Sequence, residues 1–129
     1  MSTSAVDHLL ATVCDPQQSF AEALSADVVL DATVPNWRFT VRGAQAVSRQ
    51  LASWFADPAT FDSLSRTELP GGELIRFQLR WSEHGVPHVC HQAHVVEVED
   101  GLIVADTAWC GGRWDATLVA EMEAARAGR

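Results

Sequence analysis

The sequence contains no lysine and no tyrosine, and all nine basic residues are arginine. Without lysine, Schiff-base chemistry, a phosphate-loop lysine and a pyridoxal phosphate anchor are excluded. Without tyrosine, any general acid or oxyanion donor must come from another side chain or from the backbone. The chemistry open to this chain therefore rests on His, Asp, Glu, Cys, Trp and the neutral polar side chains.

Positive charge and long apolar runs are also scarce. Nine arginines stand against seventeen acidic residues, which leaves a net charge of −8. That balance disfavours nucleic acid and anionic lipid as partners. No run approaches the roughly 18 apolar residues of a membrane span, and the first helix-like segment lacks the basic flank of a secretion signal.

Cysteine is limited to Cys14, Cys90 and Cys110. An odd number of widely spaced cysteines indicates reduced thiols rather than a disulfide framework, and we expect a cytoplasmic protein. The preference for arginine and alanine favours a bacterial source with a GC-rich genome.

What is present is enough for one hydrophobic core. With 129 residues, of which 47% are hydrophobic, the chain predicts a single domain over residues 1–129. We expect its core at about residues 5–114, followed by a tail helix at about 115–127.

Hydrophobic spacing predicts helices first and strands later. A helix ends near Cys14, a second short helix follows Asp15-Pro16, and the clearest helix runs from Gly43 to Asp57-Pro58. Alternation predicts the strands, including one with Ile75, Phe77, Leu79 and Trp81 on its buried face. The predicted strands cover residues 28–34, 38–41, 61–69, 73–82, 86–99 and 102–110. Such an order is typical of an α+β fold.

The stretch Ala26–Asp31, the helix-opening pair Arg42-Gly43, and the stretch His94–Val104 together resemble the nuclear-transport-factor-2-like (NTF2-like) superfamily. More narrowly, they are similar to its SnoaL-like, polyketide-cyclase-like branch. The resemblance implies a cone-shaped α+β fold: a strongly curved antiparallel sheet whose concave face is covered by N-terminal helices and one long helix. It also implies a homodimer through the outer sheet face, where Arg76 and Arg80 would lie.

The resemblance also identifies chemistry that this chain lacks. Ala32 occupies the position of the general-base Asp of ketosteroid isomerases, and their helix-borne Tyr has no counterpart. Gln92, His94 and Ala108 stand where limonene-epoxide-hydrolase-like members carry Arg, Asp and Asp. We therefore expect neither of these two mechanisms.

His94 and Asp106 are the predicted catalytic pair. Period-two alternation with Glu97 and Glu99 facing water places His94 on the pocket face of its strand. If Asp106 shares that face, it can orient one ring nitrogen and leave the other as a general base. A two-residue turn at Asp100-Gly101 separates the two side chains, whereas a three-residue loop with a bulge brings them together. The alternative is a structural His94 bonded to the backbone, with Asp106 solvated or bonded to Thr107.

A flat, largely apolar ligand is the expected occupant of the cavity. Its predicted binding residues are Gln92, Trp37, Trp54, Phe77, Trp109 and Cys110. A metal site of His88, Cys90, His91 and His94 is disfavoured, because the alternating ligands span about 20 Å of extended strand. No metal or other cofactor is expected.

Three functions remain open from the sequence. The first is a SnoaL-like enzyme that uses cofactor-free general acid and base catalysis, of isomerase, cyclase or lyase type, on an apolar cyclic or polyketide-like substrate. The second is a non-catalytic binding module that holds a hydrophobic metabolite in the same cavity. The third is a protein-interaction module that uses the outer sheet face.

Overall fold

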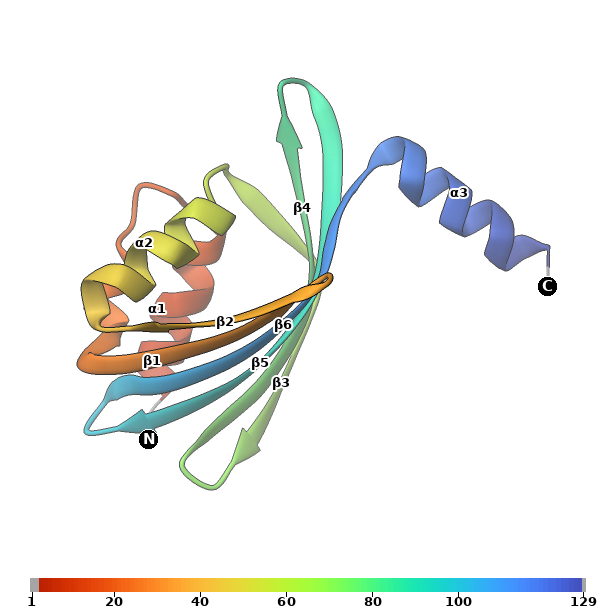
Figure 1. The fold of residues 1–129 in the computed structure, drawn as a ribbon. Helices are drawn as coiled ribbons and strands as arrows, with labels where there is room; N and C mark the ends of the chain where they lie inside the picture. The colour runs from red at the N-terminus through yellow and green to blue at the C-terminus, as the bar shows by residue number, and fades with distance from the viewer. Residues whose placement is uncertain (1–2, 129) are drawn as a thin grey trace.

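Alternating apolar residues build one six-stranded sheet in the computed structural model, which describes residues 3–128. The strand order is β2-β1-β6-β5-β4-β3, and the strands curve strongly around one side (Figure 1). The strands are β1 (Leu24–Val34), β2 (Trp37–Arg42), β3 (Ala59–Leu69), β4 (Gly72–Glu83), β5 (Val86–Glu99) and β6 (Leu102–Asp115).

One strand pair departs from the antiparallel sheet that the sequence predicts. β1 and β6 run parallel, with Leu30 opposite Asp106 and Asp31 opposite Thr107, while the other four pairs are antiparallel. The sheet is therefore mixed. A parallel pair needs a long connection instead of a hairpin, and here the whole chain between β1 and β6 supplies it.

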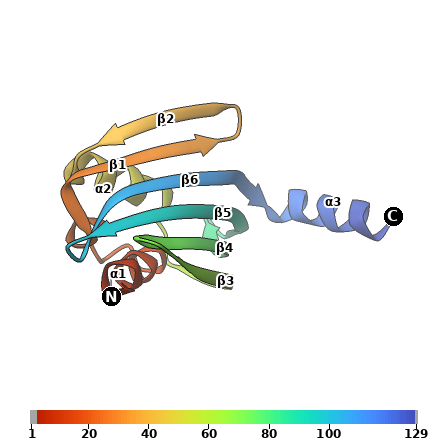
Figure 2. The same ribbon diagram turned by 90° about the horizontal axis from the view of Figure 1, so that it is seen from below.

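Helices cover the concave face of this sheet. α1 (Thr3–Cys14) packs against β3 and β6, and α2 (Ala44–Trp54) packs against β1 and β2 (Figure 2). Both bury the apolar stripes that their spacing predicts, such as Val6 and Leu9 in α1 and Val47 and Leu51 in α2. The α+β fold class and the helix-covered concave face are confirmed.

The helix predicted after Asp15-Pro16 does not form as an α-helix. The segment forms a single 3-10 turn, η1 (Phe20–Ala23), which packs against both α1 and α2. The Asp15 carboxylate instead accepts a hydrogen bond from the backbone N–H of Gln17 at 3.0 Å and closes a turn around Pro16. Ser19 then caps η1, and its hydroxyl oxygen accepts from the N–H of Ala21. Because β1 begins directly after η1, the segment has no room for a longer helix.

The last helix, α3 (Ala116–Ala127), leaves the sheet at the end of β6 and extends away from it (Figures 1 and 2). The Asp115 carboxylate caps it by accepting from the N–H of Leu118 at 2.9 Å. None of its residues is buried. The sequence predicts that the last strand ends at Cys110, but β6 continues to Asp115 and carries Arg113 along the sheet before α3 begins.

Candidate functional site

A bulge in β6 brings His94 and Asp106 to the same face of the sheet. The turn between β5 and β6 has two residues, Asp100 and Gly101, since Glu99 pairs directly with Leu102. Such a turn alone would place the two side chains on opposite faces, but Val104 is an extra residue between the pairs Val98–Ile103 and Glu97–Ala105. The two-residue turn considered from the sequence is therefore the one observed, but the bulge reverses its expected effect on the two side chains. A short turn and a bulge beyond it together return Asp106 to the buried face.

The His94 and Asp106 side chains form a direct, buried pair. The His94 Nδ1 atom lies 2.9 Å from Oδ1 and 3.0 Å from Oδ2 of Asp106. The two side chains are 4% and 3% exposed. The imidazole also stacks on the ring of Phe77, with centroids 5.6 Å apart and planes 18° from parallel. The carboxylate accepts from Nδ1 and the Phe77 ring fixes the imidazole plane, so the histidine is held in one orientation.

Gln92 links this pair to two thiols. Its Oε1 lies 2.8 Å from the His94 Nε2, and its Nε2 lies 3.5 Å from the Cys110 sulfur and 3.8 Å from the Cys90 sulfur. The Gln92 amide can be placed in two orientations. If its oxygen faces the His94 ring, both ring nitrogens face acceptors and both must donate a hydrogen bond. If its NH₂ group faces the ring, the amide donates to the His94 Nε2 and only Nδ1 donates, to Asp106. Either way, Gln92 completes a continuous polar chain from Asp106 to the cysteines.

A pocket of about 340 Å³ opens beside this chain. It lies where β1 turns into β2, near the end of α2 and beside the last part of β6. Its walls are mostly apolar and aromatic, and Gln92 contributes a polar side chain to them. The lining residues are Val34, Pro35, Trp54, Trp81, Cys90, Gln92, Cys110, Gly112 and Arg113.

Three of the predicted site residues line this pocket, namely Gln92, Trp54 and Cys110. His94, Asp106 and Phe77 are buried and do not line it. His94 is linked to the cavity through Gln92, whose Oε1 lies 2.8 Å from the His94 Nε2.

Trp37 and Trp109 require a correction, because the structure places neither of them in the pocket. Trp109 is 46% exposed on the outer face of β6, where it lines a separate groove of about 460 Å³ with Arg76 and His91. It follows Ala108, whose side chain is buried on the inner face, so strand alternation turns the indole outward. Trp37 begins β2 opposite Val34 and is 70% exposed; its neighbours Val34 and Pro35 line the pocket instead.

A charged cluster at the pocket wall is absent from the site that the sequence predicts. Arg113 forms an ion pair with Glu83, and its guanidinium carbon lies 5.0 Å from the centre of the Trp81 ring. The Trp81 indole N–H donates to the same carboxylate at 2.9 Å, and the His88 ring stacks on Trp81 with centroids 5.7 Å apart. The predicted last strand ends at Cys110, so it does not place Arg113 in the sheet. The missed signal is the Gly111-Gly112 pair, which continues β6 instead of ending it.

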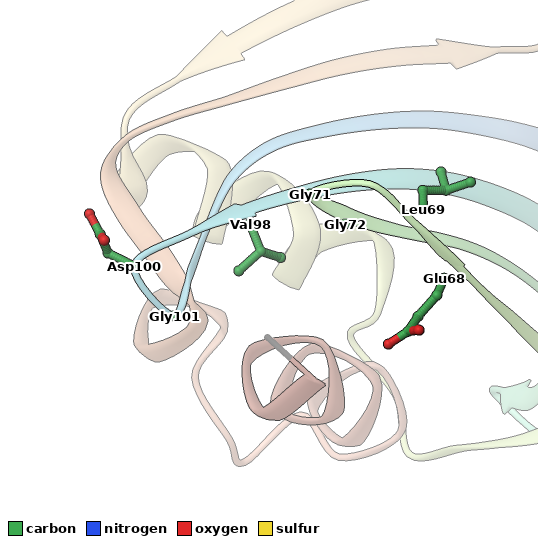
Figure 3. A pocket seen from close by; sticks show the side chains of 7 residues that line it. All are labelled: Glu68, Leu69, Gly71, Gly72, Val98, Asp100 and Gly101. Carbon is green, nitrogen blue, oxygen red and sulfur yellow. The ribbon is translucent and has the colours of Figure 1, made fainter. Parts of the chain in front are cut away.

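A second hollow, of about 430 Å³, lies at the other end of the strands (Figure 3). It is bounded by the β3–β4 and β5–β6 turns, and its charged side chains, Glu68 and Asp100, are both acidic. Figure 3 shows Asp100 pointing away from Val98 and out of the molecule. None of the predicted site residues lies here, so the pocket beside Gln92 is the better candidate site.

Metal ligands do not converge in the part of the chain that the structure describes. Within residues 3–128, no group of three or more His, Cys, Asp and Glu side chains is placed to hold an ion. His91 is exposed on the outer face, whereas Cys90 is buried on the inner one. Over the same residues, no helix has the length and apolar character needed to cross a bilayer.

The pKa of the Cys90 thiol tests whether this side chain is buried in the pocket wall. Burial, together with the nearby Cys110, raises the pKa of the Cys90 thiol from 9.0 to about 12. A raised pKa means that the folded state favours the neutral thiol, so this stabilisation is present below about pH 9 and is lost as the pH rises toward 12. Because the chain has no lysine or tyrosine, thiols dominate side-chain titration in that window.

We therefore expect the free energy of unfolding to fall by about 1 kcal/mol per pH unit between about pH 9.5 and 11. Cys90→Ala should flatten this slope, as measured by urea unfolding at each pH. Burial also raises the pKa of Cys14, by a smaller amount, so Cys14→Ala is the matched control and should flatten the slope less. Equal slopes in wild type and Cys90→Ala would show that the Cys90 thiol ionises as freely in the folded protein as in the unfolded chain.

Comparison with known proteins gives matches among solved structures. No protein-family model and no curated protein matches the sequence. An NTF2-like protein of unknown function from Mesorhizobium loti matches with a TM-score of 0.68 at 21% identity, over 86% of this chain and 91% of that one. A candidate isomerase from Bacillus subtilis matches with a TM-score of 0.66 at 17% identity, over 83% of this chain and 86% of that one.

A phenazine biosynthesis-related protein from Pseudomonas aeruginosa also matches, with a TM-score of 0.60 at 11% identity, over 85% of this chain and 76% of that one. These similarities show the fold class, which is a curved sheet with helices across its concave face. This chain has the NTF2-like fold, as its sequence predicts.

Proposed function

We propose that this protein is a small-molecule enzyme that uses cofactor-free general acid and base chemistry, of isomerase type, on an apolar cyclic substrate. The observation that carries the proposal is the buried contact between His94 Nδ1 and the Asp106 carboxylate at 2.9 Å, joined through Gln92 to an apolar pocket. An oriented imidazole that is linked to an apolar cavity is suited to moving a proton. The description of one structural neighbour as a candidate isomerase agrees with this chemistry.

Gln92 takes part in the proposed step by turning from His94 toward the pocket. That movement frees the His94 Nε2 and brings the amide N–H toward the substrate. The imidazole then removes a proton from a carbon next to a carbonyl group. The C–H electron pair forms a carbon–carbon double bond, and the π pair of the carbonyl group moves onto its oxygen, where the amide N–H stabilises the negative charge. Return of the proton to another carbon completes an isomerisation without a further reactant. Asp106 is a positioning residue that fixes the orientation of the ring.

The alternative is a binding module that holds a hydrophobic metabolite without turnover. One observation favours it: Gln92 covers the His94 Nε2 at 2.8 Å, so no free ring nitrogen of this histidine faces the pocket. In that case the buried polar chain serves to fix the inner face of the sheet and to offer one amide to the ligand.

Deuterium exchange in D₂O separates the two functions. A panel of cyclic enones and 1,3-diketones is incubated with the protein, and deuterium at the carbons next to the carbonyl is followed by NMR. His94→Ala should lower the catalysed exchange about 100-fold. His91→Ala removes an exposed histidine from the outer face of the same strand and should leave the rate unchanged. Equal rates in wild type and His94→Ala would overturn the assignment of His94, and tight binding without exchange would support the binding module.

The narrower assignment to the SnoaL-like branch stays a prediction, as do a polyketide-like substrate, the cytoplasmic location and the homodimer through the outer sheet face. The exposed Trp109 on that face agrees with a contact between two copies.

A further inference from the structure

Arg113 is the one charged side chain among the residues that line the pocket in the described part of the chain. β6 continues through Gly111-Gly112 into the pocket wall, where it pairs Arg113 with Cys90. All the other lining side chains are apolar, aromatic, thiol or amide groups. The whole chain carries a net charge of −8, so Arg113 places a positive charge in the pocket of an acidic protein.

The guanidinium is held in place from three sides. Nη2 pairs with the Glu83 carboxylate, Nη1 donates to the backbone carbonyl of Trp54 at 3.4 Å, and the group lies over the Trp81 ring at 5.0 Å. Within residues 3–128, no hydrogen bond engages its Nε. The side chain is nevertheless 43% exposed. It thus combines a fixed orientation with donors that remain accessible.

We propose that Arg113 makes this pocket selective for compact aromatic carboxylic acids. The carboxylate of the ligand binds the guanidinium, whose planar array of donors matches two carboxylate oxygens. The aromatic body lies against Trp54 and Trp81 and points toward Gln92. At about 340 Å³, the pocket is near the small end of the usual range, and it suits a body of about two or three fused rings.

Glu83 is the group that the ligand must displace. Its side chain is 28% exposed, and its Oε2 lies 3.9 Å from the Nε2 of His88. When the ligand's carboxylate takes its place on Arg113, Glu83 can turn to His88 or to water without becoming a buried, unpaired charge. Binding of the acid adds one negative charge to a protein that already carries a net charge of −8, and the contact with Arg113 offsets the repulsion that this charge meets. This inference rests on the pocket of the proposed function and does not depend on catalysis by His94.

Matched ligands test the inference directly. Binding of 2-naphthoate, 2-naphthamide and 2-naphthalenemethanol is measured by quenching of tryptophan fluorescence and by calorimetry, at about pH 7.5 and about 150 mM salt. We expect the wild type to bind the acid at least about tenfold more tightly than either neutral compound. Arg113→Gln should abolish this preference while the affinity for the amide stays within about twofold. Glu83→Gln, which removes the competing carboxylate, should strengthen binding of the acid severalfold.

Arg80→Gln is the charge-matched control, because Arg80 pairs with Asp62 outside the pocket. It changes the net charge by the same amount and should leave the preference unchanged. A wild type without a preference for the acid, including one that binds none of the three ligands, would overturn the inference. So would a preference that survives in Arg113→Gln.

The His94→Ala variant distinguishes this inference from the proposed function. It should keep the ratio of acid to amide affinity while losing proton exchange. If the protein prefers carboxylates but catalyses no exchange, the proposed enzyme activity is refuted and the role of Arg113 stands. If it catalyses exchange in neutral ketones but does not prefer acids, the role of Arg113 is refuted and the proposed enzyme activity stands.

Discussion

Replacing Gly72 by alanine is expected to destabilise the protein by about 4 kcal/mol or more, which places it among the largest effects of single substitutions. Gly72 begins β4 opposite Glu97 of β5 and is buried. A Cβ atom at this position would overlap the carbonyl oxygen of Val96 and lie 2.9 Å from its carbonyl carbon. Because the obstacle is backbone in the neighbouring strand, no side chain can move to relieve the clash. The two strands would have to separate at their first pairs.

Gly71→Ala is the matched control for this prediction. Gly71 has a positive φ of 77°, and a Cβ there would meet no atom within 4 Å. Alanine then costs only the strain of a left-handed backbone, about 1 kcal/mol. Urea unfolding followed by tryptophan fluorescence gives both values. If Gly72→Ala were no more destabilising than Gly71→Ala, the close approach of β4 to Val96 would be refuted.

Replacing Asp106 by alanine is expected to cost about 3 kcal/mol. Asp106 is 2% exposed, and its carboxylate accepts from the His94 Nδ1 at 2.9 Å. Without it, a buried imidazole loses its partner in a region that water does not reach. Asp106→Asn keeps an acceptor in about the same volume and should cost about 1 kcal/mol, again measured by urea unfolding.

Two comparisons decide whether this cost comes from the pair. Asp31→Ala removes a carboxylate from the neighbouring strand, but Asp31 pairs with the exposed Arg38 and should change stability little. The double variant Asp106→Ala with His94→Ala should cost less than the sum of the two single variants, because the buried partner is removed as well. Additive costs would show that the contact between His94 and Asp106 contributes nothing to folding.

Local patterns predicted most of the elements correctly, because each depends on neighbours in the chain. Strict alternation from Ile75 to Trp81 identified the buried face of β4, and the spacing of Val47 and Leu51 after Gly43 identified α2. The turn at Asp100-Gly101 was also predicted, since both residues adopt a positive φ that this dipeptide favours. The 3-10 turn at Phe20–Ala23 was missed, because its length depends on where β1 begins.

The candidate site was predictable only in part. Alternation along β5 placed Gln92 and His94 on the inner face, as observed. The partner of His94 depended on the bulge at Val104, and nothing in the surrounding apolar residues marks that position. In the same way, the continuation of β6 beyond its expected end brought Arg113 into the pocket wall. One inserted residue reverses which face every later side chain occupies, so small errors in register change the whole site.

The sequence by itself determined the chemistry that is absent, the order of helices and strands, the α+β class and the inner faces of β4 and β5. These follow from composition and from spacing within single segments. The tertiary structure decided the parallel pairing of β1 with β6, the meeting of His94 with Asp106, the outward position of Trp109 and the different roles of Gly71 and Gly72. Each of these depends on which residues of another strand lie opposite, and that register is set by packing between segments far apart in the chain.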